Sequence, residues 1–181
     1  DSKMLFVVSA GNGNAKGIGE DTDQKPDYPS SFDLDNVISA ANLMFDGNLA
    51  ESSNYGAKSV DIAAPGTYIV STIADNGYGF MTGTSMSAPM VTGAAAMLYS
   101  YRTDLQLSDI RKVLLETARK LPTLNGKLSS NGMLDLYAAL NYGRTTETAD
   151  SAQTEQSAAD GQKAEDMQDT EQTVAGGQDT E

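Results

Sequence analysis

The chain opens with short, continuous apolar runs, each of which stops at a turn-forming segment. Apolar runs of four to eight residues bounded by Gly, Pro or Asn predict buried strands. Residues 13–32, between the first two runs, are polar and contain Gly and Pro, which predicts a loop. The predicted strands cover residues 4–8, 36–41, 60–64, 68–72 and 78–81.

From residue 87 onward the apolar positions take helical spacing. Residues 87–101 are small and apolar on every side, which is typical of a buried helix. Pro89 is placed in its first turn, where a missing N–H group costs no hydrogen bond. The next helix is predicted to begin at Leu107 with Ser108 as its N-cap, and a last helix to span residues 134–141.

This order of elements predicts an α/β fold with a mainly parallel sheet flanked by helices. On open sheets of this kind, functional groups gather at the carboxyl ends of the strands. Asn12 follows the first predicted strand, and Ser85 lies between the last predicted strand and the long helix. Both residues are therefore expected at one edge of the sheet.

The composition divides the 181 residues into two parts. Residues 1–143 have the apolar content of a folded domain. Residues 144–181 have no aromatic side chain and are rich in Thr, Gln, Ala, Asp, Glu and Gly. Such a segment cannot bury enough apolar surface to offset the entropy of ordering, so we predict a disordered acidic tail. It would serve as a solvated linker, or as a spacer to a wall or membrane anchor further downstream.

Charge and residue usage narrow the classes of function. The formal net charge is −13, of which residues 144–181 supply −8 with 2 Lys and Arg against 10 Asp and Glu. Phosphate would be repelled, which argues against nucleic acid as a partner. Cysteine is absent, which excludes disulfides and thiolate metal sites. Histidine is absent as well, so the chain lacks the usual general base at neutral pH.

The most informative segment is residues 83–93, GTSMSAPMVTG. It places a hydroxyl between a glycine and the first turn of the predicted helix, where unpaired N–H groups and a partial positive charge are available. Ser85 can there attack a carbonyl carbon while its own N–H group holds the resulting oxyanion. The simpler interpretation is that Thr84 or Ser85 only caps the helix.

Residues 83–89, GTSMSAP, resemble the nucleophile motif of the subtilisin-like serine proteases, which implies that Ser85 is the nucleophile. Met90 departs from the family pattern, since many members carry a histidine there, but that histidine is not catalytic. Residues 7–12, VVSAGN, resemble the family's strand that ends in Ala-Gly-Asn, which implies that the Asn12 side chain donates to the oxyanion. Taken alone, Asn12 would equally well be a turn residue.

Further segments extend the resemblance over about residues 3–142. Residues 28–38 are similar to the family's Tyr-Pro segment and the strand after it. The Tyr-Pro bond is often cis in family members, so the resemblance implies a cis Tyr28–Pro29 bond. Residues 53–66 and 131–135 are similar to the family's Ala-Pro-Gly strand end and to the segment that opens its closing helix. The implied architecture is therefore a subtilisin-like α/β domain, here incomplete.

The same resemblance implies a specificity pocket. Ser9, Ala10 and Gly11 would form one wall of it, and Asp27 would lie near its floor. A carboxylate in that position would favour Lys or Arg in the substrate. The alternative is that Asp27 points into solvent, as most loop aspartates do.

The implied function is that of a serine endopeptidase that forms an acyl-enzyme on Ser85, with Asn12 in the oxyanion hole. In the family the catalytic aspartate and histidine precede the serine, so both are expected before Asp1, and the chain is expected to be inactive alone. Asp33, Asp61 and Asp135 are too weak as bases to replace the histidine.

Two alternatives remain at this point. The chain could be a catalytically degenerate, subtilisin-like binding module, or an inert scaffold for an acidic interaction tail. The retention of both Asn12 and Ser85 favours the protease, because a relaxed site tends to lose one of them.

The implied chemistry needs no cofactor and no metal. Asp21, Asp23, Asp33 and Asp35 are candidate calcium ligands, but their spacing matches no specific loop, so no site is assigned. The expected partners are polypeptide substrates. The resemblance also implies a monomer that works outside the cell or in the cell envelope.

Overall fold

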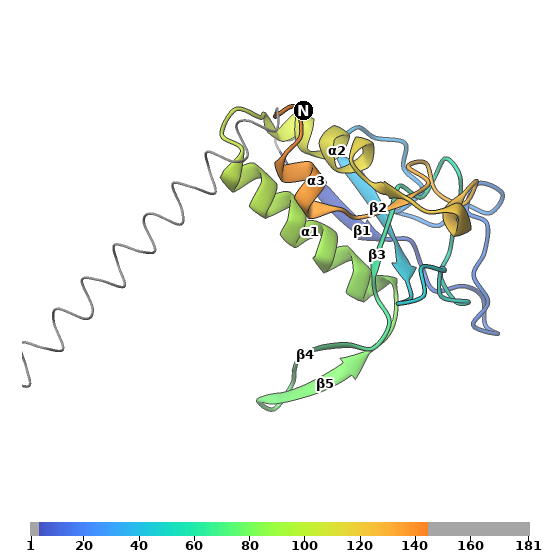
Figure 1. Ribbon diagram of the computed structural model, residues 1–181. Helices are drawn as coiled ribbons and strands as arrows, with labels where there is room; N and C mark the ends of the chain where they lie inside the picture. The colour runs from blue at the N-terminus through green and yellow to red at the C-terminus, as the bar shows by residue number, and fades with distance from the viewer. Residues whose placement is uncertain (1–3, 145–181) are drawn as a thin grey trace, which may run out of the picture. The chain divides into compact units, whose positions relative to one another are not determined.

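The computed structural model describes residues 4–144, and its first compact unit ends at Tyr142 (Figure 1). Within these residues one sheet has the strand order β1-β2-β3-β7-β6. The first four of these strands are parallel neighbours, and β6 pairs antiparallel with β7. The strands are β1 (Phe6–Ser9), β2 (Val37–Leu43), β3 (Ile62–Pro65), β6 (Arg119–Lys120) and β7 (Gly132–Met133).

Helices cover the sheet, and the longest lies across β1, β2 and β3 (Figure 1). The predicted α/β fold with a mainly parallel sheet is thereby confirmed. Apart from Arg144, the predicted acidic tail of residues 144–181 lies outside the described residues. The helices are α1 (Thr84–Tyr101), α2 (Leu107–Glu116), α3 (Leu136–Leu140) and the short 3-10 turn Pro122–Leu124.

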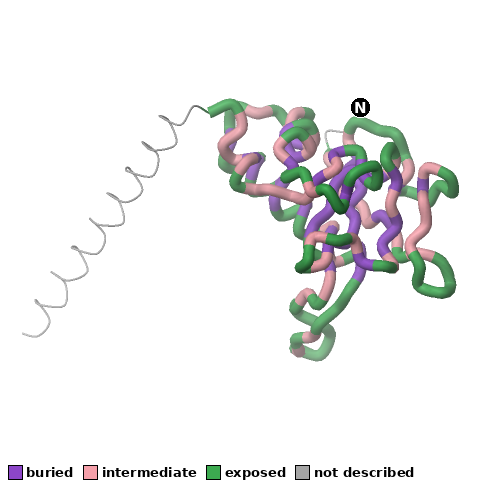
Figure 2. Tube along the Cα trace, turned by 45° about the vertical axis from the view of Figure 1, so that its right-hand side comes forward, coloured by how far each residue is buried: buried purple, intermediate pink, exposed green. Residues whose placement is uncertain are grey.

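Strand β2 is the centre of the core, since all seven of its residues are buried. Its side chains alternate between two apolar clusters, as the period of a strand requires. Ile38 and Ala40 pack with α1 and α2, whereas Ala41 and Leu43 pack with the segment around Leu124. Figure 2 shows the buried residues gathered along these strands. Burying a side chain such as Ile38 contributes about 1.5–3 kcal/mol.

The long helix differs from its prediction in two ways. It begins at Thr84 instead of residue 87, so Pro89 lies inside the helix rather than in its first turn. It is also buried on one face only, because Met90, Met97 and Tyr101 on the other face are exposed. The prediction of a helix buried all round was therefore wrong for the described residues. Small side chains alone did not reveal which face the sheet covers.

The other two helices also start differently. The N-cap of α2 is Gln106 and not Ser108, because Gln106 and Asp109 exchange the two hydrogen bonds of a capping box. Helix α3 begins two residues later than predicted, at Leu136, and the Asp135 carboxylate caps it by accepting from the Ala138 N–H group at 3.0 Å.

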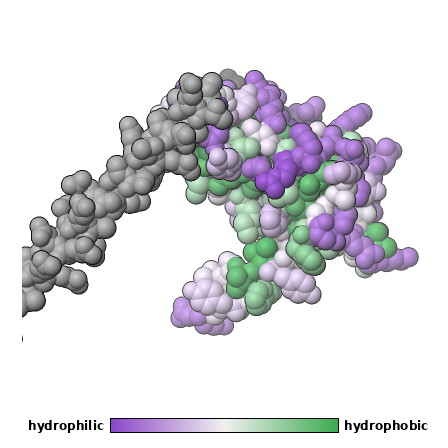
Figure 3. Space-filling view, in the orientation of Figure 1, coloured by the Kyte–Doolittle hydropathy of each residue, from purple (hydrophilic) through white to green (hydrophobic). Residues whose placement is uncertain are grey.

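A separate hairpin projects from the body directly before α1 (Figure 1). Its strands are β4 (Ile69–Ile73) and β5 (Gly77–Met81), which pair antiparallel only with each other. The side chains of Val70, Tyr78 and Phe80 are 56%, 77% and 71% exposed. Figure 3 shows hydrophobic surface over this projection. The hairpin therefore carries apolar residues that the rest of the described chain does not cover.

Candidate active site

The site begins in residues 10–13, the irregular segment after β1 that is called the turn here. Gly11 and Gly13 have φ angles of +102° and +77°, which side chains other than glycine rarely adopt. Residues in this turn reach both the start of α1 and the loop after β2. Asn12 lies between the two glycines and is exposed.

Hydrogen bonds fix the carboxamide of Asn12 against the start of α1. Its Oδ1 atom accepts from the Thr84 N–H group at 2.9 Å and from the Thr84 hydroxyl at 3.1 Å. The Thr84 Oγ1 atom in turn accepts from the Gly11 N–H group at 3.2 Å. Oδ1 faces Thr84, and the Asn12 Nδ2 group has no acceptor among residues 4–144, so it can donate to another acceptor.

Ser85 follows Thr84 and is the second residue of α1. Its side chain is exposed, whereas Thr84 is fully buried. The helix begins after Gly83 without a side-chain cap, so the interpretation of Thr84 or Ser85 as a cap is wrong. The Gly83 N–H group donates to the Gly66 carbonyl oxygen at 2.9 Å, which joins this helix start to the end of β3.

The predicted pocket residues lie together around the turn. Two of them, Ala10 and Asp27, are placed differently from the side chains of a continuous pocket wall. The Ala10 side chain is fully buried in the core, so only its backbone can face a substrate. Asp27 is exposed, yet its carboxylate points towards the turn: a Cβ atom on Gly11 would lie 2.5 Å from Asp27 Oδ2. Ser9 is the last residue of β1 and is partly buried.

The Tyr28–Pro29 peptide bond beside Asp27 is cis, which confirms what the family resemblance implied. The rings of Tyr28 and Phe32 are in contact, with their centroids 4.7 Å apart and their planes inclined at 45°.

Two of the three carboxylates considered as substitute bases, Asp61 and Asp135, have structural roles. Asp61 accepts from the Ser39 N–H group at 2.9 Å and from the Arg111 guanidinium at 2.8 Å. Burial raises the pKa of Asp61, and these partners oppose that shift without cancelling it. Asp135 caps α3 and pairs with Arg119 at 2.9 Å. Both carboxylates are thus bonded to groups other than Ser85.

The candidate calcium ligands do not form a cluster. Among the described residues, no group of three or more His, Cys, Asp or Glu side chains could hold a metal ion. Asp23 instead accepts from the Lys58 and Ser59 N–H groups and from the Ser59 hydroxyl at 2.7 Å. Burial raises its pKa, but these hydrogen bonds outweigh that effect and the pKa lies below its usual value.

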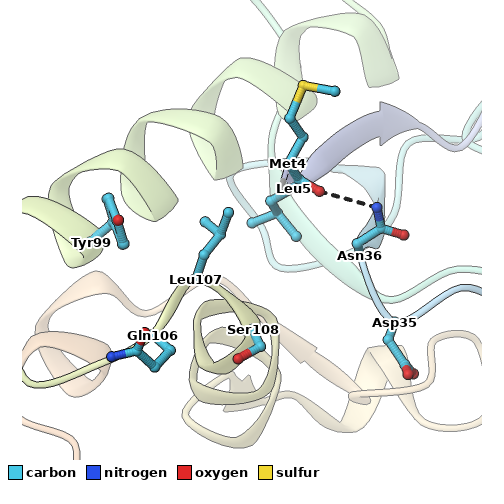
Figure 4. Close-up of a pocket in the computed structure, with 8 residues that line it drawn as sticks. All are labelled: Met4, Leu5, Asp35, Asn36, Tyr99, Gln106, Leu107 and Ser108. Carbon is cyan, nitrogen blue, oxygen red and sulfur yellow. Dashed lines mark hydrogen bonds between the residues drawn. The ribbon is translucent and has the colours of Figure 1, made fainter. Parts of the chain in front are cut away.

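A pocket of about 530 Å³ lies at the opposite end of the sheet (Figure 4). It is lined by residues that precede β1 and β2 and by the start of α2, and Asn36 Nδ2 donates there to the Met4 carbonyl oxygen at 3.1 Å. Tyr99, which also lines it, is 14 residues along α1 from Ser85, a rise of about 20 Å. This pocket is therefore separate from the candidate active site.

Two residues of the site were not predicted from the sequence. Thr84 was considered only as a helix cap, and Asn54 was quoted in a motif without a role. The buried side chain of Asn54 forms hydrogen bonds to three residues in and after the turn. The only signal in the sequence was that each lies in a segment that resembles the family.

Comparisons with known proteins agree on one family. Residues 1–170 match the model of the subtilase family, further along the chain than the resemblance noted from individual motifs. The chain is 36% identical over 139 residues to the major intracellular serine protease of Bacillus subtilis, covering 75% of this chain and 42% of that protein. It is also 36% identical over 151 residues to the extracellular basic protease of Dichelobacter nodosus, covering 76% of this chain and 23% of that protein.

More distant organisms give a similar result. Identity to subtilisin-like protease 2 of Plasmodium falciparum is 35% over 138 residues, covering 74% of this chain but 10% of that protein. A solved protease of Pseudoalteromonas arctica superposes with a TM-score of 0.63 at 29% identity, covering 75% of this chain and 42% of that one. The chain thus spans less than half the length of each of these relatives.

Proposed function

Because the chain belongs to the subtilase family, we propose that it is part of a serine endopeptidase in which Ser85 is the nucleophile and Asn12 stabilises the oxyanion. Ser85 Oγ attacks the carbonyl carbon of the scissile peptide bond and gives its proton to an imidazole. The amide nitrogen receives that proton and leaves as an amine, and water then hydrolyses the ester on Ser85. Asn12 Nδ2 and the Ser85 N–H group donate to the negatively charged oxygen of each tetrahedral intermediate.

The observation that carries this proposal is the double hydrogen bond from Thr84 to Asn12 Oδ1. It holds the carboxamide beside the residue that precedes Ser85 and leaves the Nδ2 donor unused. A donor that is fixed before the charge develops needs no reorganisation during the reaction. The same bonds hold a turn whose two glycines have positive φ angles.

We propose that the imidazole comes from polypeptide outside these 181 residues, since the chain has no histidine. Two exposed features of the described unit support the presence of further polypeptide that packs against it. The outer face of α1 exposes Met90, Met97 and Tyr101, and β1 lies at an edge of the sheet with Phe6 45% exposed. Apolar helix faces and free strand edges are normally covered by further structure.

We also propose that Asp27 selects Lys or Arg on the acyl side of the cleaved bond. Its carboxylate oxygen points towards Gly11, one residue before the oxyanion donor. Replacing Asp27 by Asn should lower kcat/KM for basic substrates at least tenfold and leave substrates with leucine almost unchanged. Asp33→Asn, in the same loop, is the matched control. Equal losses for both substrate types would exclude this role.

Secretion is the last part of the proposal. The similar proteins include one named extracellular and one named intracellular, and the family resemblance favours the first. None of the described helices is long and apolar enough to cross a bilayer. Detecting the protein in the culture medium, without a cytoplasmic marker enzyme, would support an extracellular location.

The main experiment is to label the polypeptide that contains this chain with a fluorophosphonate probe, which reacts with activated serines. Labelling should be lost in Ser85→Ala and retained in Ser100→Ala, which changes an exposed serine near the other end of α1. Absence of labelling in the unchanged protein would instead favour the alternative, a catalytically degenerate binding module.

A further inference from the structure

We propose that Asn54 is a positioning residue that sets the conformation of the turn of residues 10–13, and thereby the place of the Asn12 donor. This inference rests on the proposed function, because positioning matters only if the turn works in catalysis. Asn54 lies in the loop after β2, more than 40 residues along the chain from the turn. Its exposed fraction is 4%.

The side chain of Asn54 uses both of its polar atoms on this region. Its Nδ2 group donates to the Ala10 carbonyl oxygen at 3.0 Å, just before Gly11 with its positive φ angle. Its Oδ1 atom accepts from the Gly13 N–H group at 3.0 Å, just after Asn12. The same oxygen accepts from the Glu20 N–H group at 2.9 Å, which holds the next loop in place.

The backbone of Asn54 adds a further bond to the same turn. Its N–H group donates to the Gly11 carbonyl oxygen at 2.9 Å. One residue thus bonds to backbone atoms immediately before and after Asn12. A carboxamide is suited to this task because it presents a donor and an acceptor side by side, as a backbone does.

Asn54 and Thr84 hold the turn from different elements and act on different atoms. Thr84 fixes the Asn12 carboxamide and the Gly11 N–H group from the start of α1. Asn54 fixes the Ala10 and Gly11 carbonyl oxygens and the Gly13 N–H group. In Asn54→Ala the backbone bond to the Gly11 carbonyl oxygen remains, but the side-chain bonds that hold the Ala10 carbonyl oxygen and the Gly13 N–H group are lost.

The expected result of Asn54→Ala is a fall in kcat of about 10- to 100-fold, since a displacement of about 1 Å at a reacting centre can cost a hundredfold. The fall should not come from lost folding, so kcat is normalised to active sites counted by fluorophosphonate titration. KM should rise as well, because Ala10 and Gly11 form the proposed pocket wall.

The test is a double-mutant cycle with Asn12→Ala, carried out in the complete polypeptide. If Asn54 acts by placing the Asn12 donor, its removal should change kcat less than about twofold once that donor is absent. A residue that is merely structural would give the same fold loss in both backgrounds. Equal losses, or no loss in either, would overturn the inference.

Ser53→Ala is the matched control. Ser53 is a buried neighbour in the same loop, and its hydroxyl bonds to the Asn42 N–H group and the Asn54 carbonyl oxygen without contacting the turn. It should leave kcat per active site within about twofold of the unchanged protein. A fall as large as that of Asn54→Ala would show a general loop effect and overturn the inference. If the unchanged protein neither labels nor cleaves, the proposed function fails first.

Discussion

The turn of residues 10–13 and the β4–β5 hairpin both lie close to Ser85, yet they are held in opposite ways. The turn connects to Thr84 and Asn54 through hydrogen bonds that span 40 residues or more. The hairpin, which precedes Ser85 directly in the chain, pairs with itself and exposes Val70, Tyr78 and Phe80. Proximity in sequence to the nucleophile therefore does not decide which segment is fixed.

The difference follows from where backbone polar groups find partners. The turn follows β1 and includes the fully buried Ala10, so unpaired N–H and carbonyl groups there would be costly and distant side chains satisfy them. The hairpin satisfies its backbone within two strands and is solvated on both sides. An isolated two-stranded hairpin is marginally stable in water, so it should matter little for folding.

The largest effect is expected at the donor in the turn. Asn12→Ala should lower kcat by about a hundred- to a thousandfold with little change in KM, the magnitude measured for such a donor in subtilisin. Thr72→Ala, on the exposed hairpin, should leave kcat unchanged. Comparing both by steady-state kinetics tests whether only the turn is catalytic. A loss below tenfold for Asn12→Ala would contradict its role as oxyanion donor.

The next largest effect is expected on stability, when a glycine of the turn or of the hairpin is replaced by alanine. Gly11→Ala should destabilise the fold by about 3 kcal/mol, because φ is +102° and the new methyl would collide with Asn54 and Asp27. Gly79→Ala in the hairpin meets only Ile73 side-chain atoms at 3.3 Å and should cost less than about 0.5 kcal/mol. Denaturant unfolding measures both losses of stability. Equal losses for the two variants would contradict the view that the turn is held more tightly than the hairpin.

A smaller change in the free energy of unfolding, of opposite sign, is expected at Ser87, two residues after the proposed nucleophile. The Ser87 hydroxyl is fully buried and has no hydrogen-bond partner among the described residues. Ser87→Ala should therefore raise the free energy of unfolding by about 1 kcal/mol. Thr92→Ala, on the exposed side of α1, is the control and should change it by less than about 0.5 kcal/mol. A clear destabilisation by Ser87→Ala would mean that the hydroxyl has a partner such as an internal water.

The smallest effect on stability is expected for an exposed side chain of the hairpin. Phe80→Ser, in a side chain that is 71% exposed, should shift the free energy of unfolding by less than about 0.5 kcal/mol. Ile38→Ala, in the fully buried centre of β2, should cost about 2–5 kcal/mol in the same assay. A large cost for Phe80→Ser would show that another part of the polypeptide packs on the hairpin.

Local patterns were sufficient for some elements and insufficient for others. The segment of residues 36–41, which is largely apolar, predicted β2. The start of α1 was misplaced because Thr84, Ser85 and Met86 carry no helical periodicity of their own, and Gly83 provides no side-chain cap. Ser108 was chosen as an N-cap on residue type, whereas the capping box at Gln106 depends on a reciprocal bond with Asp109.

The sequence by itself determined the α/β class, the family and the two residues on which the proposed chemistry depends, because apolar spacing and short motifs are local properties. Only the tertiary structure decided that Thr84 and Asn54 hold the turn, that Ala10 faces the core and that one face of α1 is exposed. The contacts that hold the turn, for example, join residues 41 and 72 positions apart. No local pattern encodes such contacts, since they arise only when parallel strands bring their carboxyl ends together.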